Sequence, residues 1–163
     1  YVDFSKAFDI VSHSKQFARL HSYGIRGTLL LWLERFFTDR KHQTKVGSLL
    51  SDTENLISGI VQGSGIDPLM FLISINELIE VLQQYSIKVK LFADDVKLYG
   101  RVLNDIDNVK LQSALDALVE WANSWQLIIS IEKCCVMSIG NSNFTSKFNI
   151  DSKTLPIVTE VVI

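Results

Sequence analysis

VKLFADDVKLY, residues 89–99, places two adjacent aspartates, Asp94 and Asp95, between two apolar, alternating segments. Alternation of this kind predicts two strands, and no Gly or Pro makes room for a loose loop between them. We therefore expect a tight hairpin that carries two carboxylates at its tip. A single Asp is common in a turn, but two neighbouring carboxylates repel each other unless a cation neutralises them. For an all-oxygen site, the expected cation is Mg²⁺.

Composition favours one globular domain and no membrane partner. The chain has 163 residues, of which 47% are hydrophobic and 21% charged, as in an ordinary globular protein. Its longest apolar runs, around Leu29–Leu33 and Leu69–Ile75, are too short to span a bilayer. The adjacent Cys134 and Cys135 would point to opposite faces of a strand, so we expect reduced thiols and an intracellular setting, nuclear or cytoplasmic.

The two ends of the sequence and its charge favour a piece of a longer polypeptide. Tyr1 and Ile163 both lie in strand-like sequence, whereas domains tend to begin and end in polar segments. The net charge is −2, unlike that of a free-standing nucleic-acid binder. One local basic cluster comprises Arg35, Arg40, Lys41, His42 and Lys45. A solvated helix end is the favoured interpretation of this cluster, with phosphate contact as the alternative.

The order of the predicted elements indicates an α+β fold. We expect strands at 1–8 and 127–139, helices at 14–23, 28–39, 67–84 and 107–124, a two-stranded excursion at 42–60, and hairpins at 87–99 and within 141–163. The helix at 28–39 is apolar nearly all round, which predicts that it is sandwiched between other elements. This order suits an antiparallel sheet with helices packed on one face, in a split βαβ layout.

A further acidic position lies in the first predicted strand. In extended geometry one face of the segment DFSKAFD carries Asp3, Ser5, Ala7 and Asp9. If this strand lies beside the hairpin, Asp3 can join Asp94 at one metal site. Carboxylates from two such segments would suit two-Mg²⁺ phosphoryl transfer, with about 3.5–4 Å between the ions. Taken singly, each Asp is more simply a surface turn or a helix cap.

Four motifs resemble, in order, those of reverse transcriptases of the non-LTR (LINE-like) retrotransposon type. They are YVDFSKAFDIVSH at 1–13, SGIVQGSGIDPLMFLISINEL at 58–78, LFADDVKLY at 91–99 and LQSALDALVEWANSWQLIISIEKCCVMSIG at 111–140. The resemblance covers nearly the whole chain. It implies a polymerase palm of the ferredoxin-like type, truncated at both ends, with residues 1–163 forming a partial domain that lacks most of the fingers and the thumb.

The resemblance also implies the partners and the metal ligands. The partners would be an RNA template, a DNA primer and a dNTP. The carboxylates of Asp3, Asp94 and Asp95 would be catalytic and would bind two Mg²⁺ ions, for which Mn²⁺ can substitute. The main-chain carbonyl of Phe4 would contribute to the ion that accompanies the nucleotide.

The nucleotide itself would meet four further residues. Phe8 matches the bulky residue that excludes a 2′-hydroxyl, although a plain core aromatic is the simpler interpretation without the family pattern. Gln62 and Gly63 match the motif that lines the nucleotide pocket. Lys133 matches a lysine that protonates or neutralises departing pyrophosphate, with a solvated strand-end lysine as the alternative.

Some positions depart from the family pattern, although none is a predicted metal ligand. Val61 stands where the family has Pro, Gly65 where it has an apolar residue, Asp67 where it has Gly, and Ser130 where it has Asn. These departures suit either a working or a decaying copy. The leading hypothesis is an RNA-directed DNA polymerase. The alternatives are a catalytically inert remnant of such a domain, or another palm-type phosphoryl transferase such as a nucleotide cyclase, which has no need of the VQGSG segment.

Overall fold

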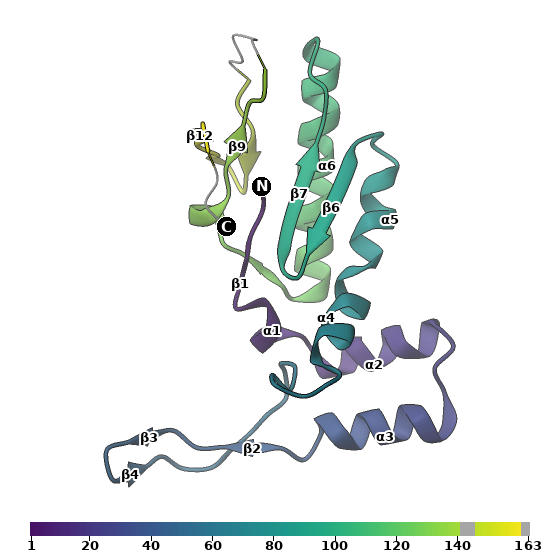
Figure 1. The fold of residues 1–163 in the computed structure, drawn as a ribbon, viewed down its shortest axis with the longest axis vertical. Helices are drawn as coiled ribbons and strands as arrows, with labels where there is room; N and C mark the ends of the chain where they lie inside the picture. The colour runs from purple at the N-terminus through teal and green to yellow at the C-terminus, as the bar shows by residue number, and fades with distance from the viewer. Residues whose placement is uncertain (141–145, 161–163) are drawn as a thin grey trace. The chain divides into compact units, whose positions relative to one another are not determined.

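The computed structural model describes residues 1–140 and 146–160, which divide into two compact units (Figure 1). Unit 1 comprises residues 1–7 together with the chain from residue 75 onward, and unit 2 comprises residues 8–74. Helices and short strand pairs occur in both units. The chain is therefore an α+β protein, as its element order predicts.

The hairpin that carries the two aspartates is the longest strand pair of unit 1 in the described residues. Strands β6 (Lys88–Phe92) and β7 (Asp95–Tyr99) pair antiparallel, with Phe92 opposite Asp95. Ala93 and Asp94 form the connecting loop, and Ala93 has a φ of 51°. The predicted hairpin is confirmed, with Asp94 in its turn and Asp95 at the start of the returning strand.

The opening segment lies between this hairpin and a later strand. Val2 pairs antiparallel with Val96 of β7, and β1 (Phe4–Ser5) pairs antiparallel with β8 (Ile128–Ile129). The prediction that the first strand lies beside the hairpin is therefore confirmed. These pairings give an antiparallel layer in the order β6, β7, opening segment, β8.

The predicted length of the first strand is wrong. Lys6 has a φ of 50°, in the left-handed region that interrupts extended backbone, and helix α1 (Ala7–Ile10) follows it. Asp9 therefore lies in a helix and does not extend the strand face that carries Asp3.

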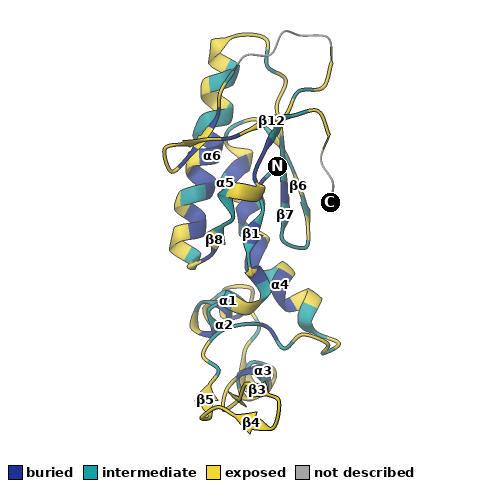
Figure 2. Ribbon diagram, turned by 90° about the vertical axis from the view of Figure 1, so that its left-hand side faces the viewer, coloured by how far each residue is buried: buried dark blue, intermediate teal, exposed yellow. Residues whose placement is uncertain are grey.

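Helices α5 (Glu77–Gln83) and α6 (Asp105–Trp125) cover one face of the hairpin. They pack against each other, and α5 contacts β6 (Figure 1). The buried residues of this layer alternate along the strands and recur at helical spacing, and Figure 2 shows them in dark blue: Val2, Phe4, Val96, Leu78, Leu82, Ala114, Leu115, Leu118, Trp121 and Ala122. Glu77 Oε2 also accepts hydrogen bonds from the indole nitrogens of Trp121 and Trp125, at 3.1 and 3.0 Å. The predicted helical face of residues 107–124 is thus the core of unit 1.

The rest of unit 1 consists of short elements. The single strand predicted over 127–139 is wrong, because a 3₁₀ turn, η1 (Ile131–Lys133), separates β8 from β9 (Val136–Met137). Strand β9 pairs in parallel with β12 (Ile157–Val158), and β10 (Asn149–Ile150) forms a hairpin with β11 (Lys153–Thr154). The hairpin predicted within 141–163 is thus present at 149–154, whereas residues 141–145 and 161–163 lie outside the described residues. Cys134 and Cys135 are free, buried thiols.

Unit 2 holds two whole helices, an arm of short strands, most of a third helix and most of the short helix α1. Its elements are α2 (His13–Ser22), α3 (Gly27–Phe37), β2 (Lys41–His42), β3 (Lys45–Val46), β4 (Leu49–Leu50), β5 (Glu54–Asn55) and α4 (Asp67–Ile75). Strand β2 pairs with β5 and β3 with β4, which confirms the two-stranded excursion. The helix predicted over 67–84 is interrupted at Asn76, where α4 gives way to α5.

The prediction that α3 is sandwiched is wrong. Its side chains Leu33 and Phe37 are buried, but Leu29 and Trp32 are about half exposed. Helix α2 packs against α3, so the apolar sequence of α3 supplies one buried face in the described part of the chain. In residues 1–140 and 146–160, no helix is both long and apolar enough to cross a membrane.

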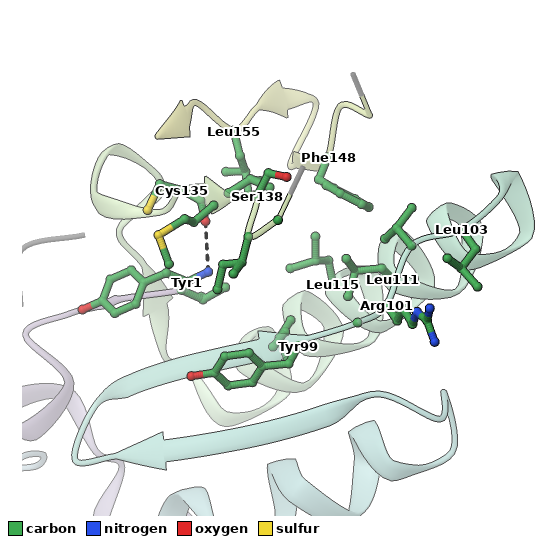
Figure 3. Close-up of a pocket in the computed structure, with 18 residues that line it drawn as sticks. Tyr1, Tyr99, Arg101, Leu103, Leu111, Leu115, Cys135, Ser138, Phe148 and Leu155 are labelled. Carbon is green, nitrogen blue, oxygen red and sulfur yellow. Dashed lines mark hydrogen bonds between the residues drawn. The ribbon is translucent and has the colours of Figure 1, made fainter. Parts of the chain in front are cut away.

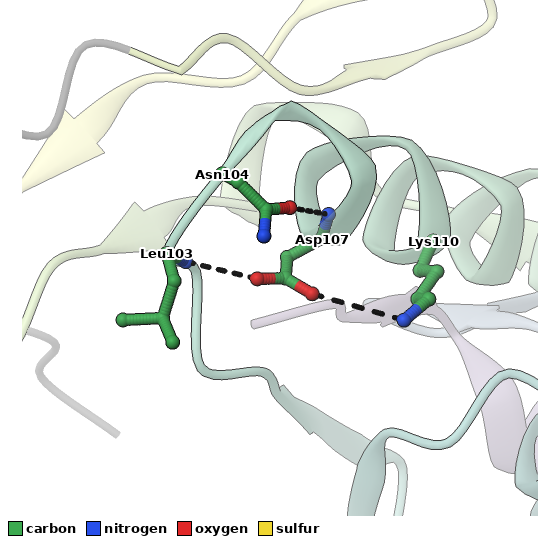
Figure 4. Close-up of polar contacts among 4 residues, drawn as sticks. All are labelled: Leu103, Asn104, Asp107 and Lys110. Carbon is green, nitrogen blue, oxygen red and sulfur yellow. Dashed lines mark hydrogen bonds and ion pairs between the residues drawn. The ribbon is translucent and has the colours of Figure 1, made fainter.

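The start of α6 shows how side chains fix a helix boundary (Figure 4). Asn104 Oδ1 accepts a hydrogen bond from the Asp107 main-chain nitrogen at 3.0 Å. Asp107 Oδ2 in turn accepts one from the main-chain nitrogen of Leu103 at 3.0 Å, and its Oδ1 lies 3.8 Å from Lys110 Nζ. The Asn104 side chain satisfies a main-chain donor that the first helical turn leaves unpaired, and the Asp107 carboxylate holds the residue that precedes the cap.

Replacing Asn104 with Ala is therefore expected to lower the free energy of unfolding by about 1 kcal/mol. Asn123→Ala is the matched control, because Asn123 is exposed on the same helix and caps nothing. Chemical denaturation of both variants checks the difference. Equal stabilities of the two variants would contradict the capping role.

Candidate active site

The pairing of Val2 with Val96 brings two of the predicted acids to one face of the sheet. The main-chain nitrogen of Val2 donates to the Val96 carbonyl at 2.8 Å, and that of Val96 donates to the Val2 carbonyl at 3.0 Å. Since the two strands run antiparallel, Asp3 lies opposite Asp95. Both valines are buried, and successive side chains alternate between faces. Asp3 and Asp95 therefore share the face away from the helices.

Asp95 is held by a tyrosine from the opening segment. The Tyr1 hydroxyl donates a hydrogen bond to Asp95 Oδ1. Burial raises the pKa of the Tyr1 hydroxyl well above its ordinary value, followed by the hydrogen bond to Asp95 and the charges of Asp95, Asp3 and Asp94. The Tyr1 hydroxyl therefore contacts the Asp95 carboxylate directly and is influenced by the charges of Asp3 and Asp94.

Asp3 is paired with the predicted motif lysine. Lys133 Nζ lies 3.5 Å from Asp3 Oδ1, and the side chains are 67% and 14% exposed respectively. The Ser130 main-chain nitrogen donates to the Asp3 carbonyl at 2.9 Å, which anchors the turn that carries Lys133.

The predicted side-chain ligands for a metal ion are the carboxylates of Asp3, Asp94 and Asp95. Asp3 Oδ1 is buried and accepts no hydrogen bond, so it keeps lone pairs for a cation, and a metal ion bound there would compete with the ammonium group of Lys133 at 3.5 Å. In the described residues, no group of three or more His, Cys, Asp or Glu side chains converges closely enough to hold a metal ion. Asp3, Asp94 and Asp95 offer oxygen donors of the type that suits Mg²⁺, but in this arrangement the three carboxylates do not converge on one point, and Asp95 is engaged by Tyr1.

The side chain of Phe4 has a structural role. It is buried in the core of unit 1, with its ring centroid 6.4 Å from that of Trp121. Its predicted contribution to a metal site concerns the main-chain carbonyl alone.

Three of the predicted residues, Phe8, Gln62 and Gly63, belong to unit 2. The Phe8 ring stacks on that of Phe71, with centroids 4.2 Å apart. Gln62 Nε2 donates to Asp9 Oδ1 at 2.8 Å. Gly63 has a φ of 81°, a backbone conformation that suits glycine, and its main-chain nitrogen donates to Asp67 Oδ2 at 2.8 Å.

A cavity of about 490 Å³ adjoins Gln62 in unit 2. Its lining is partly polar and includes Asp9, His13, Arg40 and Gln62. His13 Nε2 lies 2.7 Å from the carbonyl oxygen of Gly59, within hydrogen-bond distance. Gln62 therefore lies at an open, hydrogen-bonding surface of this unit.

Unit 1 has a separate cavity of about 480 Å³, shown in Figure 3. Its lining comes from the opening segment, the end of β7 and the loop after it, α6, and the chain after α6, and it includes Tyr1, Tyr99, Arg101, Leu111, Leu115 and Phe148. None of the three predicted acids lines this cavity. It therefore does not form the candidate site.

Sequence reasoning missed Tyr1 as a site residue. The sequence did contain a hint, because residues 1 and 3 of an extended segment lie on the same face, so Tyr1 could be expected on the face that carries Asp3. The bond to Asp95 also depends on strand register, which a single sequence does not fix.

A family model and two curated relatives all point to the same class of protein. The sequence model of the family described as "Reverse transcriptase (RNA-dependent DNA polymerase)" matches residues 1–156. The chain is 22% identical over 147 residues to the "RNA-directed DNA polymerase from mobile element jockey" of Drosophila melanogaster, covering 86% of this chain and 16% of that protein. It is 24% identical over 148 residues to the protein of the same name from Drosophila funebris, covering 87% and 16%. The chain thus spans 16% of the length of these curated relatives.

The environment of Tyr1 predicts that, in the metal-free chain, its hydroxyl loses its proton at a higher pH than an ordinary tyrosine does. Because its pKa is raised on folding, the stability that this group contributes is fully present below the ordinary tyrosine pKa of about 10 and is lost as the pH rises above it. The Tyr1 phenolate band, taken as the absorbance difference between wild type and Tyr1→Phe, is expected at higher pH in the folded chain than in denaturant. Asp95→Asn should reduce this delay without abolishing it, since burial remains. Coincident curves for folded and denatured chain would contradict the assignment.

Proposed function

This chain belongs to the reverse transcriptase family, and we propose on that premise that it carries the catalytic acids of an RNA-directed DNA polymerase. The reaction would be nucleotidyl transfer, in which a primer 3′-hydroxyl attacks the α-phosphate of a dNTP opposite an RNA template. The observation that carries the proposal is the register that sets Asp3 opposite Asp95, beside the turn that holds Asp94. We propose further that the antiparallel layer of unit 1 is a palm of the split βαβ type.

The carboxylates of Asp3, Asp94 and Asp95 and the carbonyl of Phe4 would hold two Mg²⁺ ions. Asp3 Oδ1, which accepts no hydrogen bond and already has the ammonium group of Lys133 as its neighbour, supports this assignment. When bound, the ions lower the pKa of the attacking hydroxyl and steady the leaving oxygen. The protein's own contribution is to hold acids from two strands on one rigid sheet face, where main-chain pairing keeps them in position.

Lys133 would deliver a proton to the departing pyrophosphate from its Nζ. Its contact with Asp3 Oδ1 at 3.5 Å and its largely exposed side chain support this role. An exposed lysine stem is flexible, so the ammonium group can leave the carboxylate when a more highly charged phosphate is present.

Three residues of unit 2 keep the roles that their motifs suggest. Phe8 would discriminate against a 2′-hydroxyl, and Gln62 and Gly63 would line the nucleotide pocket. The hydrogen-bonding surface at Gln62 and the positive φ of Gly63 support the second role. These assignments are carried by the motifs, residue by residue.

The alternatives differ in what they require of the acids. An inert remnant would keep the fold and lose the chemistry. A nucleotide cyclase would use paired acids without template or primer. The match to the reverse transcriptase family disfavours the cyclase, and catalysis separates the polymerase from the remnant.

Asp94→Asn is expected to abolish primer extension by the protein made from the longest open reading frame that contains this chain. The loss should exceed the roughly 10–100-fold effect typical of an outer-shell partner, because Asp94 would be a ligand. Folding stability should stay equal or rise, since the change removes repulsion with Asp95. Extension of a DNA primer on an RNA template with Mg²⁺ and dNTPs measures the activity.

Asp52→Asn is the matched control, because Asp52 is exposed in the arm of unit 2 and loses the same charge. Equal extension by the two variants would refute the role of Asp94. A folded, template-binding wild type that never extends the primer would favour the inert remnant.

Phe8→Ala is expected to relax sugar discrimination, because the smaller side chain leaves room for a 2′-hydroxyl. The measurement is the ratio of kcat/KM for a dNTP to that for its rNTP, which does not depend on how much of the variant is folded. Phe8→Val keeps more of the contact with Phe71 and should have an intermediate ratio. Unchanged ratios in both variants would show that the steric assignment is wrong.

A further inference from the structure

The exposed face of the β6–β7 hairpin gathers lysines that the sequence disperses. The register pairs Lys88 with Tyr99, Lys90 with Lys97, and Phe92 with Asp95. Residues directly opposite one another point to the same face, so Lys88, Lys90 and Lys97 share the face that carries Asp95. Lys88 and Lys90 are exposed and Lys97 is half-buried. We call these three residues the lysine face.

Repulsion between the lysines of the lysine face lowers the stability of the β6–β7 hairpin. Lys90 and Lys97 lie directly opposite each other, and like charges in this arrangement destabilise a strand pair. In residues 1–140 and 146–160, none of the three lysines forms an ion pair with a carboxylate. The contact of Lys97 is with the Tyr1 ring, whose centroid lies 6.0 Å from Lys97 Nζ. An anionic ligand would offset the repulsion.

Protection of a sheet edge does not account for the arrangement. Lysines on an edge strand discourage pairing with other chains, which would explain Lys88 and Lys90 on β6. Lys97, however, lies on β7, which pairs with β6 on one side and with Val2 on the other. An inner strand needs no such protection. The cation at position 97 therefore calls for a different explanation.

The position of the face indicates the ligand. Helices α5 and α6 cover the opposite side of the hairpin (Figure 1), so the lysine face is the side open to a partner. It runs along the strands from the acidic tip at Asp94 and Asp95. Lys88 and Lys90 are about 6.6 Å apart along β6, at roughly 3.3 Å per residue, and their flexible stems can follow a row of negative charges.

We propose that Lys88, Lys90 and Lys97 bind the sugar-phosphate backbone of the nucleic-acid strand whose end meets the acids at the hairpin tip. The proposal rests on the proposed polymerase function and extends it to a surface outside the four motifs' assigned residues. Phosphate contacts supply much of the affinity of such complexes and make it depend on salt. The carboxylates then act at the end of a strand that the lysines hold.

Lys90→Gln and Lys97→Gln, singly and together, test the proposal in the same full-length protein. The probe is a fluorescent DNA primer annealed to an RNA template, bound without dNTP and followed by anisotropy at several salt concentrations. Each substitution should reduce the slope of log affinity against log salt by about 1 and weaken binding equally for different sequences. Unfolding should require the same or more denaturant, because like-charge repulsion is removed.

Lys110→Gln is the matched control, since Lys110 lies on α6 and pairs with Asp107. It should leave the salt slope unchanged. A wild type that does not bind, an unchanged slope in the double variant, or lysine variants that lose stability while binding normally would each overturn the proposal.

The two proposals fail separately. Asp94→Asn should bind the probe as the wild type does and fail to extend it, whereas the lysine variants should bind more weakly. Lysine-dependent binding without extension by the wild type would retain the lysine face and refute the polymerase function. Primer extension by the wild type, together with binding that does not depend on the three lysines, would support the polymerase function and refute the role of the lysine face.

Discussion

The main-chain pairing of Val2 with Val96 is the interaction on which the arrangement of unit 1 depends. It joins the start of the chain to the returning strand of a hairpin far along the sequence. Its register sets Asp3 opposite Asp95 and places Tyr1 within reach of the Asp95 carboxylate. A slip of one residue in this register would turn every side chain to the other face of the sheet. Burial of the two valines therefore also keeps the acids on the face that is not covered by helices.

Much of the fold could be predicted because local patterns and tertiary packing agree. The hairpin of β6 and β7 and the helix α6 follow from alternation and helical spacing, and both are confirmed. The predictions failed where one backbone angle or one neighbour decides the outcome. The φ of Lys6 ends the first strand early, and α3 stays half exposed because apolar composition does not say what packs against a helix.

The candidate site was predictable in its residue types and less so in its contacts. Motif positions lead to Asp3, Asp94, Asp95 and Lys133 as predicted site residues, and the ion pair between Asp3 and Lys133 is a contact that the motifs alone do not predict. The bond from Tyr1 and the opposition of Lys90 and Lys97 are products of register. A chain with an overall charge of −2 can thus present the lysine face, because strand pairing brings together lysines that are not adjacent in the sequence.

The turn between β6 and β7 restricts which residue types can occupy position 93, directly before Asp94. With a φ of 51°, Ala93 occupies left-handed backbone that costs an L-residue roughly 1–2 kcal/mol. Glycine would relieve that cost, asparagine would bear it, and a β-branched valine or isoleucine would be the most strained at this φ. Natural variation at position 93 should therefore be narrow for a purely geometric reason. An invariant small residue beside the acids would be no sign that its own side chain takes part in the chemistry.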